Sequence, residues 1–545
     1  MLSKAGWNVR RHLGTKTRYN WRAPMPGAPS LHDTPDPEGY KPLTLWLLSR
    51  HGTRWPTEHR MTHINGLEGL FRDARNTLDH PWIEAWSSPV KDKLLASGDK
   101  MLASGVLHSV GEEEMWALGA RLRGRFPGIA NHHYAPYKFP IVATQVLRTS
   151  ASATAFASGF FPSVPVGSDY ITLASGGGGG WAAAGATAGA AKGAATGVAT
   201  GGAAGATMGA AAGAATGGAA GGGKLADDGP RRAQAVSVFM RPKTDDPLLR
   251  FYDTCPAYAA QLVASKEWMA TWMSGLWAQL APDLERSLGL VRAMQPSEVD
   301  ALWTLCTLEA GLEDDTSRAC SLFDARAVEV MEWVDDVRLL EAHGPAHDIN
   351  YAIAAPLLAD LGDTLSAAAR EVVPTVRAQL LFAHAETIVP LATLMGLLSD
   401  DDDGDDDGGE GGGSSSRSNQ SNSSGSGSDA DPASVLDLGQ QRMRQRPPKL
   451  PFDHSARLFR GTRVSPYGAN LIAVLYRATE RAAAGDGATQ AVQARHRVRL
   501  AYNEQVVGVP GCSGSGLDCD LDEFLELYAA RSDSAIFERA CRTAA

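Results

Sequence analysis

Cysteine is scarce in this sequence, which has six cysteines in 545 residues, and none of the six stands in a CxxC pair. Structural zinc sites usually contain such pairs, so we expect no structural zinc. Cys512 and Cys519 flank a Gly/Ser-rich loop that suits a local disulfide, and Cys306 and Cys320 could close another. An even count with this spacing fits an oxidising compartment, and buried free thiols are the alternative.

The sequence also lacks an excess of positive charge, because its formal net charge is −10. The stretch 399–431 accounts for −9 of this, with ten acidic residues and one arginine. The remainder is close to neutral, so charge alone indicates neither a nucleic acid nor an anionic membrane as a partner. A near-neutral body can still contain one basic pocket.

Two further absences concern export and membranes. Residues 1–19 lack the apolar core of a signal peptide, which favours a cytosolic protein or a gene start that lies upstream. Residues 175–223 are almost entirely Gly, Ala and Thr and contain no Leu or Ile, so we expect a flexible insert and no transmembrane segment. Residues 399–431 are rich in Asp, Gly and Ser and are expected to form a second, disordered insert.

Outside the inserts, the hydrophobic pattern changes from α/β to helical and back. Short strands are predicted at 141–144 and 376–382, a helix is predicted at 149–160, and the stretch 256–368 is mostly helical. A helical cap inserted into an α/β domain explains this order most simply. We therefore expect an α/β fold with a central, mostly parallel sheet flanked by helices. Its predicted parts are a first α/β segment (1–160), the cap (161–370) and a second α/β segment (371–545).

A run of apolar residues, Leu43–Leu48, is followed closely by the motif Arg-His-Gly-Thr-Arg, which begins at Arg50. Such a run is typical of a strand buried on both faces, and ligands of open α/β sheets bind beyond the carboxyl ends of these strands. Arginine binds phosphate oxygens in a planar, bidentate way, so Arg50 and Arg54 suit phosphoryl transfer. His51 is the candidate nucleophile, since nearby arginine charge lowers the pKa of its ring.

The Arg-His-Gly-Thr-Arg motif allows two further interpretations. Gly52 would let a ligand approach the backbone closely, because glycine has no side chain. The whole group could also be an ordinary cluster of salt bridges on the surface, which is the alternative to a phosphate site.

A second strand-end histidine stands far along the chain. His384 follows an apolar strand, and Glu386 would lie in the first turn of the following helix. A leaving alcohol needs a proton, and a positioned carboxylic acid such as Glu386 could supply it. The two strand-end histidines could meet at one edge of the sheet. The alternative is that this triplet is only a capped helix start.

These two motifs and their surroundings resemble the histidine acid phosphatases, and most closely the multiple inositol polyphosphate phosphatases. The resemblance is carried by RHGTRWPT at Arg50 and AHAETIVPL at Ala383, and it covers nearly the whole chain outside the inserts. Further matching segments are HLGTKTRY at His12, GEEEMWALGARLRGRFPG at Gly111, TQVLRTSASATAFASGFF at Thr144, LLRFYDTCPAY at Leu248, CSLFD at Cys320, RVSPYGANLIAVLY at Arg463 and YNEQVVGVPGC at Tyr502. The His-Ala-Glu triplet distinguishes this family from acid phosphatases and fungal-type phytases, which have His-Asp there.

The resemblance implies roles for particular residues. His51 would accept the phosphoryl group as a phosphohistidine, and Glu386 would be the proton donor. The substrate would be bound by the other site residues, which are Arg50, Arg54, Arg148, His384 and Lys16. The resemblance also implies the histidine phosphatase fold with an α-helical cap, no metal and no cofactor, because arginines supply the electrostatic stabilisation.

The sequence departs from this family in two respects. Tyr40 and Ala355 stand where many members have cysteines, so a bond between those two positions would be absent here. Members are usually secretory, in the endoplasmic reticulum lumen or outside the cell, whereas no signal sequence is visible in this chain. The resemblance implies a secretory localisation, and a cytosolic one stays open.

The function expected from the residues and the resemblance together is hydrolysis of inositol polyphosphates, phytate included, by a phosphomonoesterase. Alternatives within the superfamily are a broad-specificity histidine acid phosphatase and a 2,3-bisphosphoglycerate phosphatase. Alternatives from other classes are a catalytically inactive inositol-phosphate-binding protein and a Gly/Ala-rich wall or matrix protein. The expected partner is an anionic small molecule, and no nucleic acid is expected.

Overall fold

The computed structural model describes residues 8–91, 104–166, 230–398, 457–479, 495–514 and 516–542. The two inserts expected from composition, 175–223 and 399–431, lie outside these ranges. The chain divides into a large unit, residues 1–162 with 234–545, and a small one, residues 163–233. The described part of the small unit contains two short antiparallel strands, β3 (Val164–Pro165) and β4 (Arg231–Arg232).

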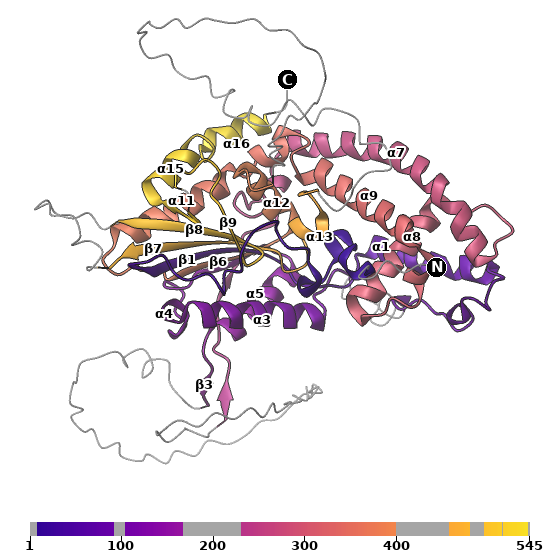
Figure 1. The fold of residues 1–545 in the computed structure, drawn as a ribbon, viewed down its shortest axis with the longest axis horizontal. Helices are drawn as coiled ribbons and strands as arrows, with labels where there is room; N and C mark the ends of the chain where they lie inside the picture. The colour runs from indigo at the N-terminus through magenta and orange to yellow at the C-terminus, as the bar shows by residue number, and fades with distance from the viewer. Residues whose placement is uncertain are drawn as a thin grey trace, which may run out of the picture. The chain divides into compact units, whose positions relative to one another are not determined.

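An eight-stranded sheet forms the centre of the large unit (Figure 1). Its strands in spatial order are β10 (Asp518–Asp520), β8 (His496–Tyr502), β7 (Asn470–Ala478), β1 (Tyr40–Arg50), β6 (Ala378–Ala383), β2 (Ile141–Ala143) and β5 (Val238–Phe239), with β9 (Gln505–Val507) beside β8. The strands β1, β6, β2 and β5 pair in parallel, whereas β7, β8, β9 and β10 add antiparallel pairs. The predicted α/β class with parallel core strands is confirmed. The antiparallel strands come from a part of the sequence in which no strands were predicted.

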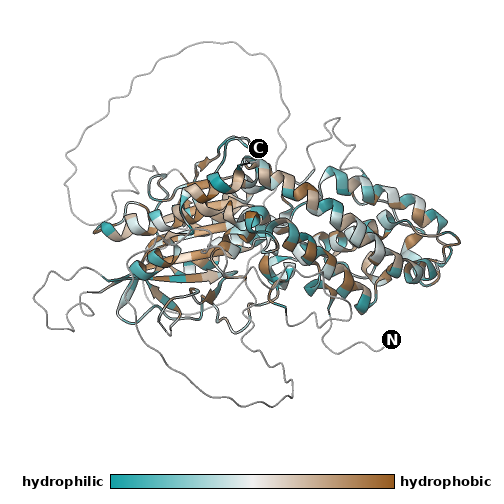
Figure 2. Cartoon of the chain, turned by 90° about the horizontal axis from the view of Figure 1, so that it is seen from above, coloured by the Kyte–Doolittle hydropathy of each residue, from teal (hydrophilic) through white to brown (hydrophobic). Residues whose placement is uncertain are grey.

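Strand β1 runs through the core because its side chains alternate between two apolar layers. Trp46 and Leu48 belong to one hydrophobic cluster, and Leu45 and Leu47 belong to another. Successive side chains of a strand point to opposite faces, so a strand covered on both faces needs a continuous apolar run. Figure 2 shows the hydrophobic residues concentrated in the sheet and the hydrophilic ones on the outward turns of the helices.

Helices cover both faces of the sheet (Figure 1). One face carries α3 (Ser109–Arg125), α4 (Pro127–Ala130) and α5 (Leu147–Phe160), and the other carries α11 (Ala355–Arg370), α12 (Ala385–Leu394), α15 (Leu521–Ala529) and α16 (Ser534–Cys541). Helices α3 and α5 pack very closely at two glycines. A Cβ on Gly119 would lie 2.3 Å from the carbonyl oxygen of Phe156, and one on Gly159 would lie 2.1 Å from that of Trp116.

A helical region lies beside the sheet. It consists of α1 (Glu58–Asp73), α7 (Pro256–Leu288), α8 (Pro296–Leu308) and α9 (Ala325–His343), which share a separate hydrophobic cluster. Shorter helices and turns connect the parts: η1 (Val9–Arg11), η2 (Gly14–Lys16), η3 (Tyr19–Trp21), η4 (Pro81–Ile83), η5 (Phe251–Asp253), η6 (Glu309–Glu313), η7 (Ala319–Leu322), α10 (Asp348–Ala352) and α13 (Gly461–Val464). The mostly helical stretch predicted at 256–368 is confirmed, as are the strands β2 and β6 and the helix α5. The domain boundaries at 160 and 370 stay a prediction.

One apolar helical stretch stands out within the described residues. Asp348–Arg370 is long and apolar enough to span a membrane, and half of it is buried inside the protein. It comprises α10 and α11, and α11 places Leu357, Leu361 and Leu365 in the hydrophobic cluster on the sheet. Its apolar residues are therefore accounted for by packing in the core.

All six cysteines form disulfide bonds, which are Cys306–Cys320, Cys512–Cys519 and Cys255–Cys541. The first two are the pairs expected from spacing, and the alternative of buried free thiols is wrong. The third pair was not predicted, because its cysteines are separated by 286 residues. It joins the start of α7 to the end of α16.

We expect the long-range disulfide to contribute more stability than the short one. A disulfide restricts the unfolded chain, and the restriction grows with the length of the loop that it closes. Cys255→Ala with Cys541→Ala should lower the free energy of unfolding by about 2–5 kcal/mol. Cys512→Ala with Cys519→Ala should lower it less, since only seven residues separate that pair. Urea titration followed by circular dichroism measures both, and a larger loss for the short loop would contradict this account.

Candidate active site

The carboxyl ends of β1 and β6 bring two histidines together. The strands are parallel neighbours with Arg50 opposite Ala383, so His51 and His384 follow at the same edge of the sheet. The backbone N–H of His51 donates to the carbonyl oxygen of Ala383 (3.1 Å), and the two imidazole centroids lie 5.6 Å apart. Strand pairing thus positions side chains from two distant motifs.

The loop after His51 packs against the first turn of α3. A Cβ on Gly52 would lie 2.4 Å from the carbonyl oxygen of Gly111, and one on Gly111 would lie 2.2 Å from that of Thr53. The expectation that Gly52 opens the backbone to a ligand is therefore wrong, because another backbone fills that space. Glu114 accepts a hydrogen bond from the Thr53 N–H (2.8 Å) and fixes the loop.

His51 is 3 % exposed and has one ring nitrogen bound. Its Nδ1 lies 2.9 Å from the carbonyl oxygen of Gly52, to which only an Nδ1–H can donate. Burial lowers the pKa of His51 well below its ordinary value, and the charges of Arg148, Arg50 and Arg54 lower it further. The ring is therefore neutral, with a lone pair on Nε2, which is the form that acts as a nucleophile.

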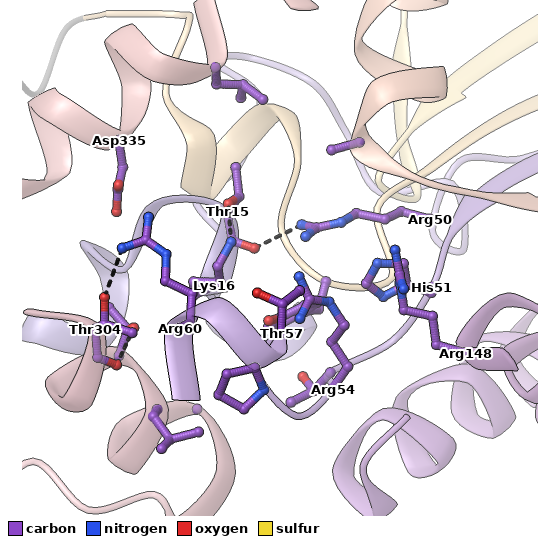
Figure 3. A pocket seen from close by; sticks show the side chains of 18 of the residues that line it. Thr15, Lys16, Arg50, His51, Arg54, Thr57, Arg60, Arg148, Thr304 and Asp335 are labelled. Carbon is purple, nitrogen blue, oxygen red and sulfur yellow. Dashed lines mark hydrogen bonds between the residues drawn. The ribbon is translucent and has the colours of Figure 1, made fainter. Parts of the chain in front are cut away.

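Three arginines surround this histidine (Figure 3). Arg50 donates to the carbonyl oxygens of Thr15 (2.8 Å) and Ser465 (2.5 Å), and Arg54 donates to that of Trp55 (2.8 Å). Arg148 approaches Nδ1 of His384 at 3.2 Å. Among the described residues, none of the three forms an ion pair with a carboxylate, and the Nε of each is buried without a hydrogen-bond partner. Their charge is thus available to an anion.

These residues line a cavity of about 310 Å³ that extends from His51 into the helical region. Figure 3 shows Lys16 and Arg60 on the side away from His51. Lys16 donates to the hydroxyl of Thr15 (3.0 Å), and burial, followed by the charges of Arg54 and Arg50, lowers the pKa of Lys16 to about 7. The cavity therefore has more positive charge than a single phosphate requires.

Two further arginines in the cavity wall are already paired. Arg60 and Arg338 both bind the carboxylate of Asp300, and Arg338 also binds Asp335 (3.0 Å). Trp303 donates to the other oxygen of Asp335 (3.0 Å). These ion pairs and hydrogen bonds fix the part of the cavity wall formed by α8 and α9.

Glu386 lies in the first turn of α12 and lines the same cavity. Burial alone raises the pKa of its carboxyl, but the neighbouring His343, His384 and Arg50 outweigh burial and hold the pKa well below its usual range. His343, at the end of α9, also lines the cavity, and burial lowers its pKa. The hydroxyl of Tyr258 contacts Nδ1 of His343 at 2.7 Å. Among these neighbours Glu386 is thus a carboxylate.

The comparison with protein families decides the superfamily. A model described as "Histidine phosphatase superfamily (branch 2)" matches residues 44–417. The chain belongs to this superfamily. Multiple inositol polyphosphate phosphatase 1 of Gallus gallus is 21% identical over 501 residues, which are 88% of this chain and 84% of the relative. The Homo sapiens protein of the same name is 22% identical over 526 residues, which are 91% of this chain and 82% of the relative.

Solved structures of two phosphatases have a similar fold. The phytase from D. castellii has a TM-score of 0.61 at 13% identity, with 99% of this chain and 89% of that chain covered. The multiple inositol polyphosphate phosphatase of Bifidobacterium longum, in complex with inositol hexasulfate, has a TM-score of 0.54 at 16% identity, with 98% and 100% covered. At these identities the likeness shows the fold.

The residues expected from sequence converge on one place. Six of them line the cavity, namely Lys16, Arg50, His51, Arg54, Arg148 and Glu386, and His384 lies behind it against His51 and Arg148. Sequence reasoning missed Arg60, Arg338, His343 and the buried Arg250, which contacts His384. Arg250 lies within LLRFYDTCPAY, a segment that matched the family, but no spacing rule connects it to His384.

We expect anion binding to weaken as Lys16 loses its proton. Inositol hexasulfate is a suitable probe because sulfate esters keep their charge from pH 6 to 8.5, and His51 and His384 are neutral throughout this range. The anion favours the charged lysine, so above the free pKa of about 7 binding must take up a proton. The affinity should then fall about tenfold per pH unit.

Lys16→Arg is the matched control, because arginine stays charged at these pH values. Its affinity for inositol hexasulfate should change little from pH 7 to 8.5 in isothermal titration calorimetry. Parallel pH profiles for the wild type and Lys16→Arg would show that Lys16 does not bind the anion.

Proposed function

We propose that this chain is a phosphomonoesterase that hydrolyses inositol polyphosphates, phytate included, through a phosphohistidine intermediate on His51. The observation that carries the proposal is the neutral, buried His51 with a free Nε2, surrounded by Arg50, Arg54 and Arg148 without carboxylate partners. A nucleophile and stabilising charge are thereby available at one point. The names of the relatives, which are inositol polyphosphate phosphatases and phytases, support the same chemistry.

In the first step, Arg50, Arg54 and Arg148 bind the oxygens of the substrate phosphate. His384 donates a further hydrogen bond to it. Nε2 of His51 attacks phosphorus, so that an N–P bond forms while the P–O bond to inositol breaks. Protonated Glu386 gives its proton to the leaving oxygen, which departs as an alcohol. The arginines stabilise the negative charge of the transferring group.

In the second step, water attacks the phosphorus of the phosphohistidine. Glu386, now a carboxylate, accepts a proton from this water. The N–P bond breaks, its electron pair returns to Nε2 of His51, and inorganic phosphate leaves. Glu386 is protonated again at the end, so the cycle closes without a further proton donor.

The proposed substrate class rests on the positive charge that the cavity carries away from the position of the reacting phosphate. Lys16 lines the cavity and, among the described residues, donates only to the Thr15 hydroxyl. Burial, followed by the charges of Arg54 and Arg50, lowers its pKa, so its positive charge has no carboxylate partner there. A second phosphate on the same molecule would supply a negative partner. A relative bound to inositol hexasulfate supports a polyanionic inositol ligand. The three disulfides support placement in the secretory pathway, because such bonds persist in oxidising compartments.

His51→Ala tests the proposal as a whole. The variant should fold and should release no phosphate from phytate, because no other nucleophile replaces Nε2. Acid quenching of the wild type during turnover should trap an acid-labile phosphate on the protein, detected with labelled substrate, and the variant should carry none. Residual activity of a tenth of wild type or more in the variant would refute the assignment of His51.

Glu386→Gln separates the proton donor from the nucleophile. Glutamine is similar in size but cannot give a proton, and an inositol alkoxide leaves poorly without one. We expect the turnover of phytate to fall about 10²–10⁴-fold. Turnover of p-nitrophenyl phosphate should fall much less, because nitrophenolate leaves readily. Equal losses on the two substrates, measured from pH 4 to 8, would mean that Glu386 is not the acid.

A further inference from the structure

Behind His384 lies a buried arginine to which the mechanism above gives no role. Arg250 is 6 % exposed and does not line the cavity. Its Nη1 lies 3.2 Å from Nε2 of His384, and its Nε donates to a carboxylate oxygen of Asp253 (2.7 Å). Arg250 therefore contacts the histidine from the side opposite to the substrate.

The two ring nitrogens of His384 have different neighbours. Nε2 lies 2.8 Å from the hydroxyl of Thr144 and near Arg250, whereas Nδ1 lies 3.2 Å from Arg148. A neutral imidazole has one N–H and one lone pair, and arginine can only donate. The Thr144 hydroxyl rotates and can either donate or accept, so Arg250 is the fixed donor at Nε2. Arg148 is likewise a donor, at Nδ1, but it lines the cavity where an anion can bind it, whereas Arg250 is buried and held by Asp253. The lone pair is therefore expected on Nε2, opposite the donor that substrate does not reach, and the hydrogen on Nδ1.

We propose that Arg250 is a positioning residue, which holds His384 as the Nδ1–H tautomer so that its hydrogen points toward the phosphate bound by Arg148. This rests on the function proposed above, in which His384 donates to the phosphate. Nδ1–H and the Arg148 guanidinium are then two donors that face each other. An anionic oxygen between them would accept from both, which completes the arrangement when substrate binds.

The segment that carries Arg250 is fixed to α12, which begins directly after His384. The Thr387 hydroxyl donates to the carbonyl oxygen of Leu249 (2.8 Å), and Asp246 accepts from the Leu249 N–H (2.9 Å). The Cys255–Cys541 disulfide anchors the chain a few residues later. Arg250 therefore has the fixed position that a tautomer-setting residue needs.

The proposal predicts a pH-dependent defect. The charged and titratable groups around His384 are Arg50 and His51 from β1 and its end, Arg148 from α5, Arg250 with Asp253, and Glu386 from α12. Burial lowers the pKa of His384 well below its usual value, and Arg148, Arg250 and Arg50 lower it further against the effect of Glu386. Removing Arg250 raises this pKa. A bound anion raises it too. As the pH falls, the ring of the variant should therefore gain its second hydrogen at a higher pH than the ring of the wild type, and once both nitrogens carry hydrogens the tautomer no longer matters.

The test measures the Arg250→Met variant on p-nitrophenyl phosphate. This substrate has a leaving group that departs without a proton from Glu386. We expect kcat/KM to fall roughly 10–100-fold at pH 7.5, the usual effect of losing a hydrogen bond to a charged group. The loss should shrink toward pH 4.5. Arg241→Met, an exposed arginine in a nearby segment, is the matched control and should leave activity unchanged. A loss of the same size at every pH would overturn the proposal, since a structural defect does not follow the protonation of His384.

A double-mutant cycle excludes an effect that bypasses His384. In the His384→Ala background there is no ring to orient, so Arg250→Met should add little further loss of kcat/KM. If the loss in the double variant equals the product of the two single losses, the proposal is overturned. Arg250→Lys keeps a cationic donor and should recover most of the activity. If Arg250→Met does not fold, the lysine variant takes the same pH test, with a smaller loss that again shrinks in acid. Trapping of phosphohistidine in wild type tests the proposed function separately from this role.

Discussion

The site depends on positive charge that is gathered in one cavity without carboxylate partners. Taking a guanidinium out of water is costly unless its N–H groups find acceptors. For Arg50 the acceptors are the carbonyl oxygens of Thr15 and Ser465, and for Arg54 the carbonyl oxygen of Trp55. A carbonyl group satisfies a donor but leaves the charge in place. The field of these arginines therefore remains available to an incoming anion.

This requirement explains why distant parts of the chain meet at the end of β1. Thr15 comes from the N-terminal segment, and Ser465 immediately precedes the turn into β7. A buried carboxylate, Glu332 of α9, ties the same regions together from behind, because it binds both His12 (2.8 Å) and Arg460 (2.6 Å). The carbonyl groups that hold Arg50 are thus fixed by an ion-paired network that does not reach the cavity, so its negative charge does not cancel the charge of the site.

The sequence predicts the part of this arrangement that obeys local rules. Buried strands have a continuous apolar pattern, and so β1, β6 and the residues at their ends could be located, as could the two short-range disulfides. Arg250 and His343 could not, because each is one polar residue in a turn or helix, and only the packing of that element against α12 or the cavity gives it a partner. The pairing of β7 with β1 and the Cys255–Cys541 bond are long-range contacts of the same kind.

The groups around the cavity also set the protonation of the residues that would react with phosphate. Burial, followed by the charges of Arg148, Arg50 and Arg54, keeps His51 neutral. His343, His384 and Arg50 outweigh burial at Glu386 and keep its carboxyl ionised, so the nucleophile has its reactive form and the acid does not. A bound polyphosphate brings negative charge next to both groups and offsets the charge of the arginines, which raises the pKa of both. For Glu386 this rise supplies the proton that the leaving alcohol needs. For His51, direct contact of Nε2 with phosphorus removes the site where a proton would bind. Substrate charge therefore favours protonated Glu386 while Nε2 of His51 stays free to attack phosphorus. A ligand with a single phosphate raises the pKa of Glu386 less than a ligand with several.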